Sequence, residues 1–75
     1  MKIKLFGRLV EITGQREIEI DQVYDRAQLI LVLQENYPAL VGISYAVAID
    51  RQIVSENVAL DQDMEIALLP PFSGG

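Results

Sequence analysis

One segment of the sequence has helical periodicity, a capping residue and a terminating proline, and shorter segments with strand alternation flank it on both sides. Asp25 is a good N-cap residue, and Gln28 stands three positions later, which is the spacing of a capping box. Pro38 ends the segment after about three turns. The apolar residues at helical spacing are Leu29, Val32, Leu33 and Tyr37. A single helix must bury its apolar side on a second layer, and the flanking strands supply a sheet.

The centre of this segment is compatible with a second interpretation. Residues 29–33, LILVL, are apolar at every position and include two β-branched residues, so by themselves they also fit a buried strand. The cap, the polar residues 34–36 and Pro38 favour the helix. In that helix, Ile30 or Leu31 is partly exposed, because the apolar run is wider than one face.

Two short segments before the helix alternate apolar and polar residues and predict a hairpin. They cover residues 2–6 and 16–20. The inward-facing residues are Ile3, Leu5, Ile18 and Ile20. The outward-facing residues of the first segment are Lys2, Lys4 and Phe6. Residues 7–15 are expected to form the connection, with one helical turn that ends at Gly14.

Two further strands are predicted after the helix. Residues 45–50 place Tyr45, Val47 and Ile49 on one face and Ala46 and Ala48 on the other. A tight turn at Arg51-Gln52 is expected to lead into a short strand, residues 53–54. A polar loop, residues 55–63, follows, and its apolar residues Val58 and Leu60 are expected to point inward. Residues 64–69 turn Met64, Ile66 and Leu68 inward.

The order of elements predicts an α+β fold with a mixed sheet and one main helix packed on one face. A hairpin, a crossing helix and returning strands are the β-grasp, or ubiquitin-like, pattern. In that topology the first and last strands lie parallel in the middle of the sheet. We expect a single domain over residues 1–75, with a protruding C-terminal tail at residues 70–75.

Several classes of site are excluded by residue types that the sequence lacks. Without cysteine or histidine, the chain can form neither a thiolate metal site nor a Ser-His-Asp triad. Its glycines match no phosphate-binding loop. Asp61 and Asp63, followed by Glu65, are compatible with a weak cation site or an acid/base pair, but we favour a solvated turn, where aspartate is common. We therefore do not expect an enzyme that acts alone.

The charge and hydropathy of the chain narrow its partners and its compartment. A net charge of −5 at pH 7 disfavours nucleic acid, because phosphate backbones repel an acidic domain. No segment reaches the roughly 20 apolar residues of a membrane span. The N-terminal residues lack the long apolar run of a signal peptide. We expect a cytoplasmic protein with a protein partner and no membrane association.

The final residues, PPFSGG, carry the candidate reactive group. Gly74 and Gly75 form a thread thin enough for a narrow channel in a partner, with the terminal α-carboxylate at its tip. Pro70 and Pro71 favour extended geometry and hold the thread away from the body. A carboxylate must be activated before acyl transfer, usually as an acyl adenylate, and a partner enzyme has to do this because the chain has no ATP-binding motif. A plain disordered end is the alternative, since termini are often disordered.

Outward positions of three predicted strands are apolar where a wet surface is expected. They are Phe6, Ala46, Ala48, Ala67 and Leu69, and Ile53 extends the group. If the first and last strands are neighbours, Phe6 and Leu69 lie on one patch. Such a patch indicates a docking site for a protein partner. Scattered surface apolar residues, which are common, are the alternative.

The ending MEIALLPPFSGG on a β-grasp pattern resembles the MoaD family, the small subunits of molybdopterin synthase. That family ends in a strand followed by Pro-Pro-x-Ser/Thr-Gly-Gly, and the matching residues are Pro70, Pro71, Ser73, Gly74 and Gly75. The stretch from Phe6 to Gly14 resembles the family's Phe-x-x-(Leu/Arg)-Glu-x-x-Gly, and Ala48-Ile49-Asp50 stands where Ala-Val-Asn is common. Asp50 is thus expected to change the hydrogen bonding of its turn. Gln62 replaces a usual glycine, which costs roughly 1 kcal/mol if its φ is positive.

The resemblance implies a sulfur carrier of the ThiS/MoaD ubiquitin-like superfamily. An E1-like enzyme of the MoeB type would adenylate the carboxylate of Gly75 with ATP and Mg, and a sulfur donor would turn it into a thiocarboxylate. Gly74 and Gly75 would then reach the active site of a MoaE-like large subunit, which forms the dithiolene of molybdopterin from cyclic pyranopterin monophosphate. This chain would bind no cofactor and no metal itself, and would have no activity alone.

The same resemblance implies which residues contact partners, and it leaves alternatives open. The implied partner-binding residues are Phe6, Ile53, Leu69, Pro70, Pro71, Phe72 and Ser73. The alternatives are a sulfur carrier for thiamine, cysteine or tRNA thiolation, a ubiquitin-like modifier joined to lysines, and an interaction domain without tail chemistry. The Pro-Pro pair favours the MoaD type, because ThiS-like tails usually lack it.

Overall fold

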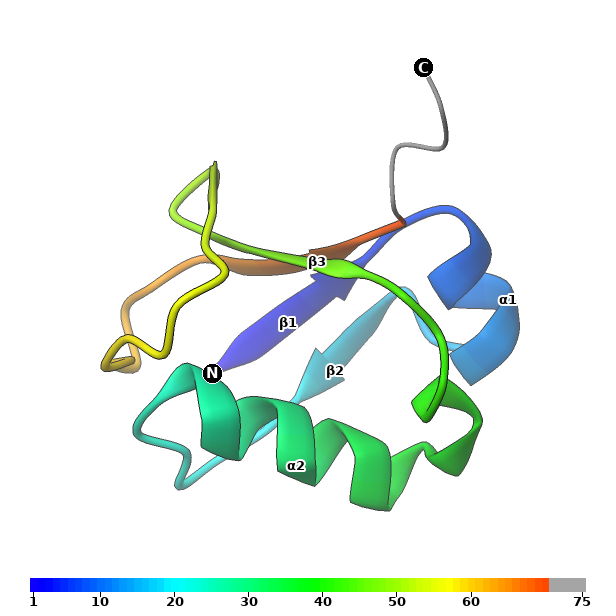
Figure 1. Ribbon diagram of the computed structural model, residues 1–75, viewed down its shortest axis with the longest axis horizontal. Helices are drawn as coiled ribbons and strands as arrows, with labels where there is room; N and C mark the ends of the chain where they lie inside the picture. The colour runs from blue at the N-terminus through cyan, green and yellow to red at the C-terminus, as the bar shows by residue number, and fades with distance from the viewer. Residues whose placement is uncertain (71–75) are drawn as a thin grey trace.

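Residues 1–70, the part of the chain that the structure describes, form a mixed five-stranded sheet with helix α2 across one face (Figure 1). The structure is a computed structural model. The elements in chain order are β1 (Lys2–Leu5), α1 (Arg8–Thr13), β2 (Glu17–Glu19), α2 (Arg26–Asn36), the 3₁₀ helix η1 (Pro38–Leu40), β3 (Ala46–Ile49), β4 (Gln52–Ile53) and β5 (Ile66–Leu69).

The strands lie in the order β2-β1-β5-β3-β4. β1 and β5 are parallel neighbours in the middle of the sheet, and the pairs β1–β2, β3–β5 and β3–β4 are antiparallel. Helix α2 follows the β1–β2 hairpin and precedes the returning strands (Figure 1). The predicted α+β class, the β-grasp topology and the central parallel pair are therefore confirmed.

The sheet face that carries α2 is built from aligned apolar residues of four strands. The strand register places four buried isoleucines in one row, which are Ile18, Ile3, Ile66 and Ile49. Leu29 and Leu33 of α2 are fully buried in the same core. Each such side chain stabilises the fold by about 1.5–3 kcal/mol relative to an exposed one. The alternation in the sequence thus predicted the buried face correctly.

Helix α2 begins with the predicted cap. The carboxylate of Asp25 accepts a hydrogen bond from the backbone N–H of Gln28 at 2.8 Å. The side chain of Gln28 reaches back and accepts a hydrogen bond from the N–H of Tyr24, also at 2.8 Å. The Gln28 side chain therefore supports the helix start from one residue further back than a standard capping box does.

The apolar run of residues 29–33 is helical throughout, so the strand alternative is wrong. The helix ends at Asn36, one residue before its C-cap Tyr37, and Pro38 begins η1. Leu31 remains 58 % exposed on the solvent side, as expected for one residue of a run that is wider than the buried face.

The connection between β1 and β2 is more helical than predicted. It contains the six-residue helix α1 rather than a single turn. The predicted end at Gly14 is correct, since Gly14 has a left-handed φ of 73° and its N–H donates to the carbonyl of Val10 at 2.7 Å. Leu9 buries the inner side of this helix in the core, which explains why the segment is longer than its two glycines suggest.

The turn between β3 and β4 lies one residue earlier than predicted. Asp50 and Arg51 form it, with φ of 48° and 69°, and Gln52 already belongs to β4. Two successive residues with positive φ are typical of a type I′ hairpin turn, which matches the twist of the strands. Gln62 does not have a positive φ, so the condition for a conformational cost at that position is not met.

The loop between β4 and β5 is fastened to the start of α2. The N–H of Arg26 donates to the carbonyl of Val58 at 3.0 Å, and the N–H of Leu60 donates to the carbonyl of Tyr24 at 2.9 Å. Leu60 is buried and Val58 is half-buried against the core, as predicted.

Candidate functional site

The candidate site has two parts, the C-terminal tail and the apolar patch on the sheet. The predicted tail residues Pro71, Phe72, Ser73, Gly74 and Gly75 lie outside the described residues. Pro70, the root of the tail, is described and follows β5 directly. Because β1 and β5 are parallel, Phe6 and Pro70 leave the sheet at the same end, next to α1 (Figure 1).

The sheet face opposite α2 has an apolar half that the strand register assembles. One row across the sheet consists of Lys4, Ala67, Ala48 and Ile53. In the next row, toward the tail, Leu69 pairs with Ala46. Leu5 pairs with Leu68, so Phe6 is level with Leu69 when the register continues by one residue. The structure therefore brings the predicted residues together on one face, and we call Phe6, Ala46, Ala48, Ile53, Ala67 and Leu69 the apolar patch.

The members of the apolar patch differ in exposure. Phe6 is 46 % exposed and Ile53 is 57 % exposed, whereas Leu69 is half-buried. Ala48 lies on the predicted outward face of the sheet, but it is buried there, with 5 % of its surface exposed. β3 lies between β5 and β4, so the short side chain of Ala48 has a neighbouring strand on each side, with Ala67 and Ile53 as its cross-strand partners. Phe6 and Ile53 are thus the most exposed side chains of the apolar patch, and the residues between them are less exposed.

The other half of the same face is charged. Lys4 stands opposite Glu17 and Lys2 stands opposite Glu19 in the β1–β2 register. Cross-strand pairs of opposite charge favour the strand pairing modestly. Lys4 also neighbours Ala67, so the charged half borders the apolar patch at this pair of residues. A partner that covers the apolar patch therefore meets lysine side chains at one edge.

Sequence reasoning missed Gly7 as a residue of the site. Gly7 has φ of 56° and ψ of −132° and precedes α1. The N–H of Leu9 donates to the carbonyl of Phe6 at 3.2 Å, so residues 6–9 form a turn of the type II′ kind, which needs glycine at its second position. A β-carbon at Gly7 would lie 3.2 Å from Cγ of Pro70. A glycine directly after a strand was the available signal, but its partner 63 positions later could not be inferred without the fold.

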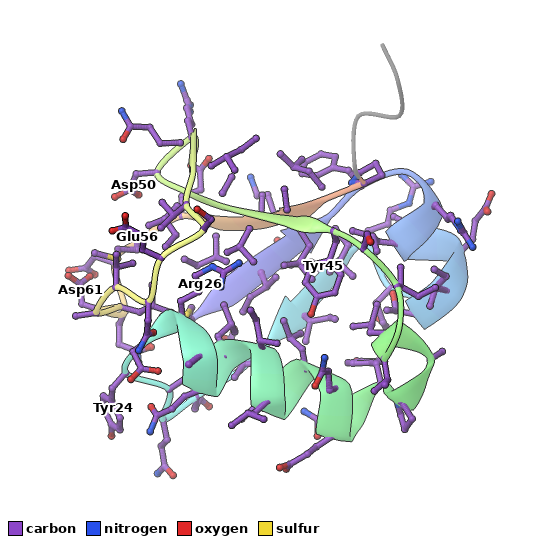
Figure 2. All side chains as sticks on the ribbon, in the orientation of Figure 1. Tyr24, Arg26, Tyr45, Asp50, Glu56 and Asp61 are labelled. Carbon is purple, nitrogen blue, oxygen red and sulfur yellow. The ribbon has the colours of Figure 1, made fainter. Side chains whose placement is uncertain are left out.

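The acidic residues before β5 form a turn. The carboxylate of Asp61 accepts a hydrogen bond from the N–H of Asp63 at 3.0 Å, and both residues are exposed. Within residues 1–70, no three acidic side chains are grouped in a way that could hold a metal ion. Figure 2 shows Asp50, Glu56 and Asp61 together at the end of the molecule remote from α1. The geometry therefore fits the solvated turn that the sequence favoured.

Tyr45 lies on the helix side of the sheet and not on the apolar patch. Figure 2 shows its side chain between β3 and α2, toward the interior. Burial raises the pKa of the Tyr45 hydroxyl above its ordinary value, and the charge of Arg26 partly offsets this. The hydroxyl has no hydrogen-bond partner among residues 1–70.

None of the helices in the described range, residues 1–70, has both the length and the apolar character needed to cross a membrane.

Comparison with known protein families places the chain. The ThiS family matches residues 3–75, which is nearly the whole sequence. The chain belongs to the ThiS family. A full-length relative in this family group is the molybdopterin synthase sulfur carrier subunit of Caenorhabditis elegans, which is 33% identical over 81 residues and aligns with 100% of this chain and 96% of its own length. The predicted kinship with the MoaD type of the ThiS family is thereby confirmed.

Solved structures related to the ThiS-family chain share its fold. The solution structure of small archaeal modifier protein 1 from Methanosarcina acetivorans has a TM-score of 0.83 at 28% identity, and the match covers 99% of this chain and 94% of that one. A complex of subunits 1 and 2 of the molybdopterin-converting factor from Helicobacter pylori contains a chain with a TM-score of 0.72 at 27% identity, with coverage of 99% and 96%. The ubiquitin-like β-grasp is therefore the fold of both carrier-type and modifier-type relatives.

Proposed function

We propose that this chain is the sulfur-carrier subunit of a molybdopterin synthase, with the sulfur held as a thiocarboxylate on Gly75. The observation that carries the proposal is the full-length match to relatives named molybdopterin synthase sulfur carrier subunit, in a family match that extends to Gly75. The sequence adds the Pro-Pro-x-Ser-Gly-Gly ending. The apolar patch lies beside Pro70, the root of this ending. A partner enzyme can bind the folded domain at this patch while it modifies the C-terminal residue.

The proposed chemistry begins at the C-terminal carboxylate. One of its oxygens attacks the α-phosphorus of ATP, pyrophosphate leaves, and an acyl adenylate forms on Gly75. Sulfur supplied at the sulfide oxidation level, as HS⁻, then attacks the acyl carbon. A C–S bond forms, the bond between the acyl carbon and the AMP oxygen breaks, and AMP and a proton are released. An E1-like enzyme would supply the ATP and Mg site, because the chain has no phosphate-binding loop. We place these steps in the cytoplasm, where ATP is available.

In the proposed complex the large subunit docks on the apolar patch. Phe6 and Ile53 are its most exposed side chains and are candidate anchors, because a few side chains that fill pockets of the partner carry most of the binding energy of an interface. The complex of subunits 1 and 2 from Helicobacter pylori, which includes a chain of this fold, supports a two-subunit assembly. Docking on a patch next to Pro70 would deliver Gly74 and Gly75 to the partner's active site, with Pro71, Phe72 and Ser73 along the way.

A protein-modifier role is the second candidate. It is favoured by the likeness to small archaeal modifier protein 1 from Methanosarcina acetivorans, whose TM-score of 0.83 is higher than the 0.72 of the Helicobacter pylori chain. The same acyl adenylate would then react with a lysine amine of a target, and an isopeptide bond would form in place of the thiocarboxylate. The two roles share the first step and differ in the nucleophile.

The deciding experiment is intact mass spectrometry of the protein from a host with a working molybdenum-cofactor pathway. The proposal predicts the mass change of one sulfur in place of one oxygen, confined to the C-terminal peptide and absent when Gly75 is deleted. Isopeptide-linked fragments of this chain on other proteins would instead support the modifier role. An unmodified tail, with the E1-like enzyme, ATP and a sulfur donor in excess, would reject both.

A further inference from the structure

Pro70 sits directly against the backbone of Gly7. A β-carbon at Gly7 would lie 3.2 Å from Cγ and 3.8 Å from Cδ of the proline ring. The first distance is shorter than a comfortable carbon–carbon contact of about 3.5–4.0 Å. A β-carbon at position 7 would therefore crowd the ring, and the ring would have to shift by a few tenths of an ångström to make room for it.

The backbone of Gly7 independently requires glycine. Its φ of 56° with ψ of −132° falls in a region that residues with a β-carbon strongly disfavour. This conformation turns the chain from β1 into α1, and the carbonyl of Gly7 then accepts a hydrogen bond from the N–H of Val10 at 3.0 Å. The turn holds the Cα of Gly7 in a fixed place at the end of β1, where it forms a seat for the ring of Pro70.

The other side of Pro70 is open. Pro70 borders a hollow of about 300 Å³ whose remaining lining residues are Arg8, Leu9, Gly42, Ile43 and Ser44. The ring of Pro70 therefore has room to move away from Gly7. A methyl group added at position 7 is expected to displace Pro70, the root of the tail.

We propose that Gly7 is a positioning residue for the tail: the close approach of Pro70 to Gly7 sets the direction in which the chain leaves the sheet at the root of the tail. This inference rests on the proposed function, because direction matters only if a partner binds the body and acts on the tip. Phe6 of the apolar patch is the neighbour of Gly7 in the sequence, so the docking surface and the seat of the tail share one rigid turn.

The test is a double-mutant cycle in the adenylation reaction of the full chain. The variants are Gly7→Ala, Pro70→Ala and the pair together, assayed by pyrophosphate release with ATP and an E1-like enzyme of the MoeB type. Gly14→Ala is the control for a methyl group added at a positive φ, because Gly14 has a φ of 73° but no atom within 4 Å of its β-carbon position. The ψ of Gly14 is 12° and that of Gly7 is −132°, so the double-mutant cycle is what separates backbone strain at Gly7 from its contact with Pro70. Urea unfolding of each variant gives the folded fraction, and titration with the E1-like enzyme gives the Kd of docking.

Misplacement of a reacting group by about 1 Å can lower a rate by about a hundredfold. We therefore expect Gly7→Ala to lower kcat at least tenfold with an unchanged Kd, and Gly14→Ala to leave kcat unchanged once the folded fraction is considered. In the Pro70→Ala background, Gly7→Ala should lower kcat only slightly further, because the proline ring that the added methyl group displaces is absent. If Gly7→Ala does not fold, Pro70→Ala carries the test alone, with a reduced kcat at an unchanged Kd as the expected result.

Two results overturn the positioning role. One is an equal loss from Gly7→Ala in both backgrounds, which would mean that strain at Gly7 acts without Pro70. The other is a wild-type kcat for folded Gly7→Ala or for Pro70→Ala. Failure of the proposed function is distinguishable from both, because the wild-type chain itself would then release no pyrophosphate.

Discussion

Asp50 and Glu65 exchange two hydrogen bonds. The backbone N–H of Asp50 donates to the carbonyl of Glu65 at 2.8 Å, and the N–H of Glu65 donates to the Asp50 carboxylate at 2.9 Å. Asp50 lies in the turn between β3 and β4, and Glu65 immediately precedes β5. The turn that leads into Ile53 of the apolar patch is thus tied to the strand that leads into the tail. The second bond uses one side-chain oxygen, which an asparagine at position 50 also has.

Asp50→Ala is expected to destabilise the fold by about 1–2 kcal/mol. It removes the acceptor for the Glu65 N–H, and alanine tolerates the left-handed φ of 48° less well than aspartate. Urea unfolding measures the loss. Asp50→Asn keeps both the acceptor and the tolerance of this φ, so its stability should stay close to wild type. A loss in Asp50→Asn equal to that in Asp50→Ala would show that the carboxylate charge matters instead.

Arg51→Gly is expected to stabilise the fold by about 1 kcal/mol, because glycine relieves the left-handed φ of 69° at the second position of a type I′ turn. The substitution also removes an ion pair between Arg51 Nε and Glu65 at 3.8 Å, but both side chains are exposed and such pairs contribute little. Arg51→Ala is the control, since it removes the ion pair and keeps the φ. Stabilisation of both variants, or of neither, in urea unfolding would contradict this explanation.

The contact between the Met1 ammonium and Glu19 is expected to make the free energy of unfolding depend on pH in both the acidic and the alkaline range. The ammonium donates to the Glu19 carboxylate at 2.7 Å. This hydrogen bond raises the pKa of the ammonium above 8.0 and lowers the pKa of the Glu19 carboxyl below 4.5, and burial partly opposes both shifts. Asp21, at 3.6 Å from the ammonium, raises its pKa further.

The sign of each flank follows from these shifts. The ammonium contributes fully below pH 8.0, and its contribution is lost as the pH rises through the raised pKa. The carboxylate contributes fully above pH 4.5, and its contribution is lost as the pH falls through the lowered pKa. The difference in unfolding free energy between wild type and Glu19→Gln should therefore be largest between these values and shrink on both sides. A difference that is constant across the pH series would rule the contact out as its source.

Phe6→Asp is expected to leave the fold intact and to abolish docking of the large subunit. Phe6 is 46 % exposed, so the core loses little, whereas a charge buried in an interface is costly. Loss of an anchor residue corresponds to about 2 kcal/mol or more, which is more than tenfold in Kd. Leu31→Asp is the matched control, because Leu31 is similarly exposed but lies on α2, on the other side of the sheet. Equal binding by the Phe6 and Leu31 variants would remove the apolar patch as the docking site.

The parts of this fold that the sequence predicted are those governed by local periodicity and capping. The alternation around Ile3 and Ile66 placed both strands and their buried face, and Asp25 and Pro38 set the ends of α2 nearly to the residue. These signals suffice because each one describes contacts with water or with residues a few positions away.

The parts that could not be predicted depend on distant neighbours. The burial of Ala48 follows from strands on both sides of it, and alternation alone reports only the face on which a residue lies. The type I′ turn at Asp50 and Arg51 lacks the usual glycine, so its two positive φ angles could not be located from residue types. The contact between Gly7 and Pro70 exists only once β1 and β5 are paired in parallel.

The placement of lysine on this molecule has a practical consequence. The chain contains two lysines, Lys2 and Lys4, and both lie on the charged half of the face that carries the apolar patch. A reagent specific for side-chain amines therefore labels this face of the domain and no other. Protection of Lys4 from acetylation in the presence of a partner would footprint the docked state of the unmutated protein, and a dye coupled through lysine would block the very surface that it was meant to report.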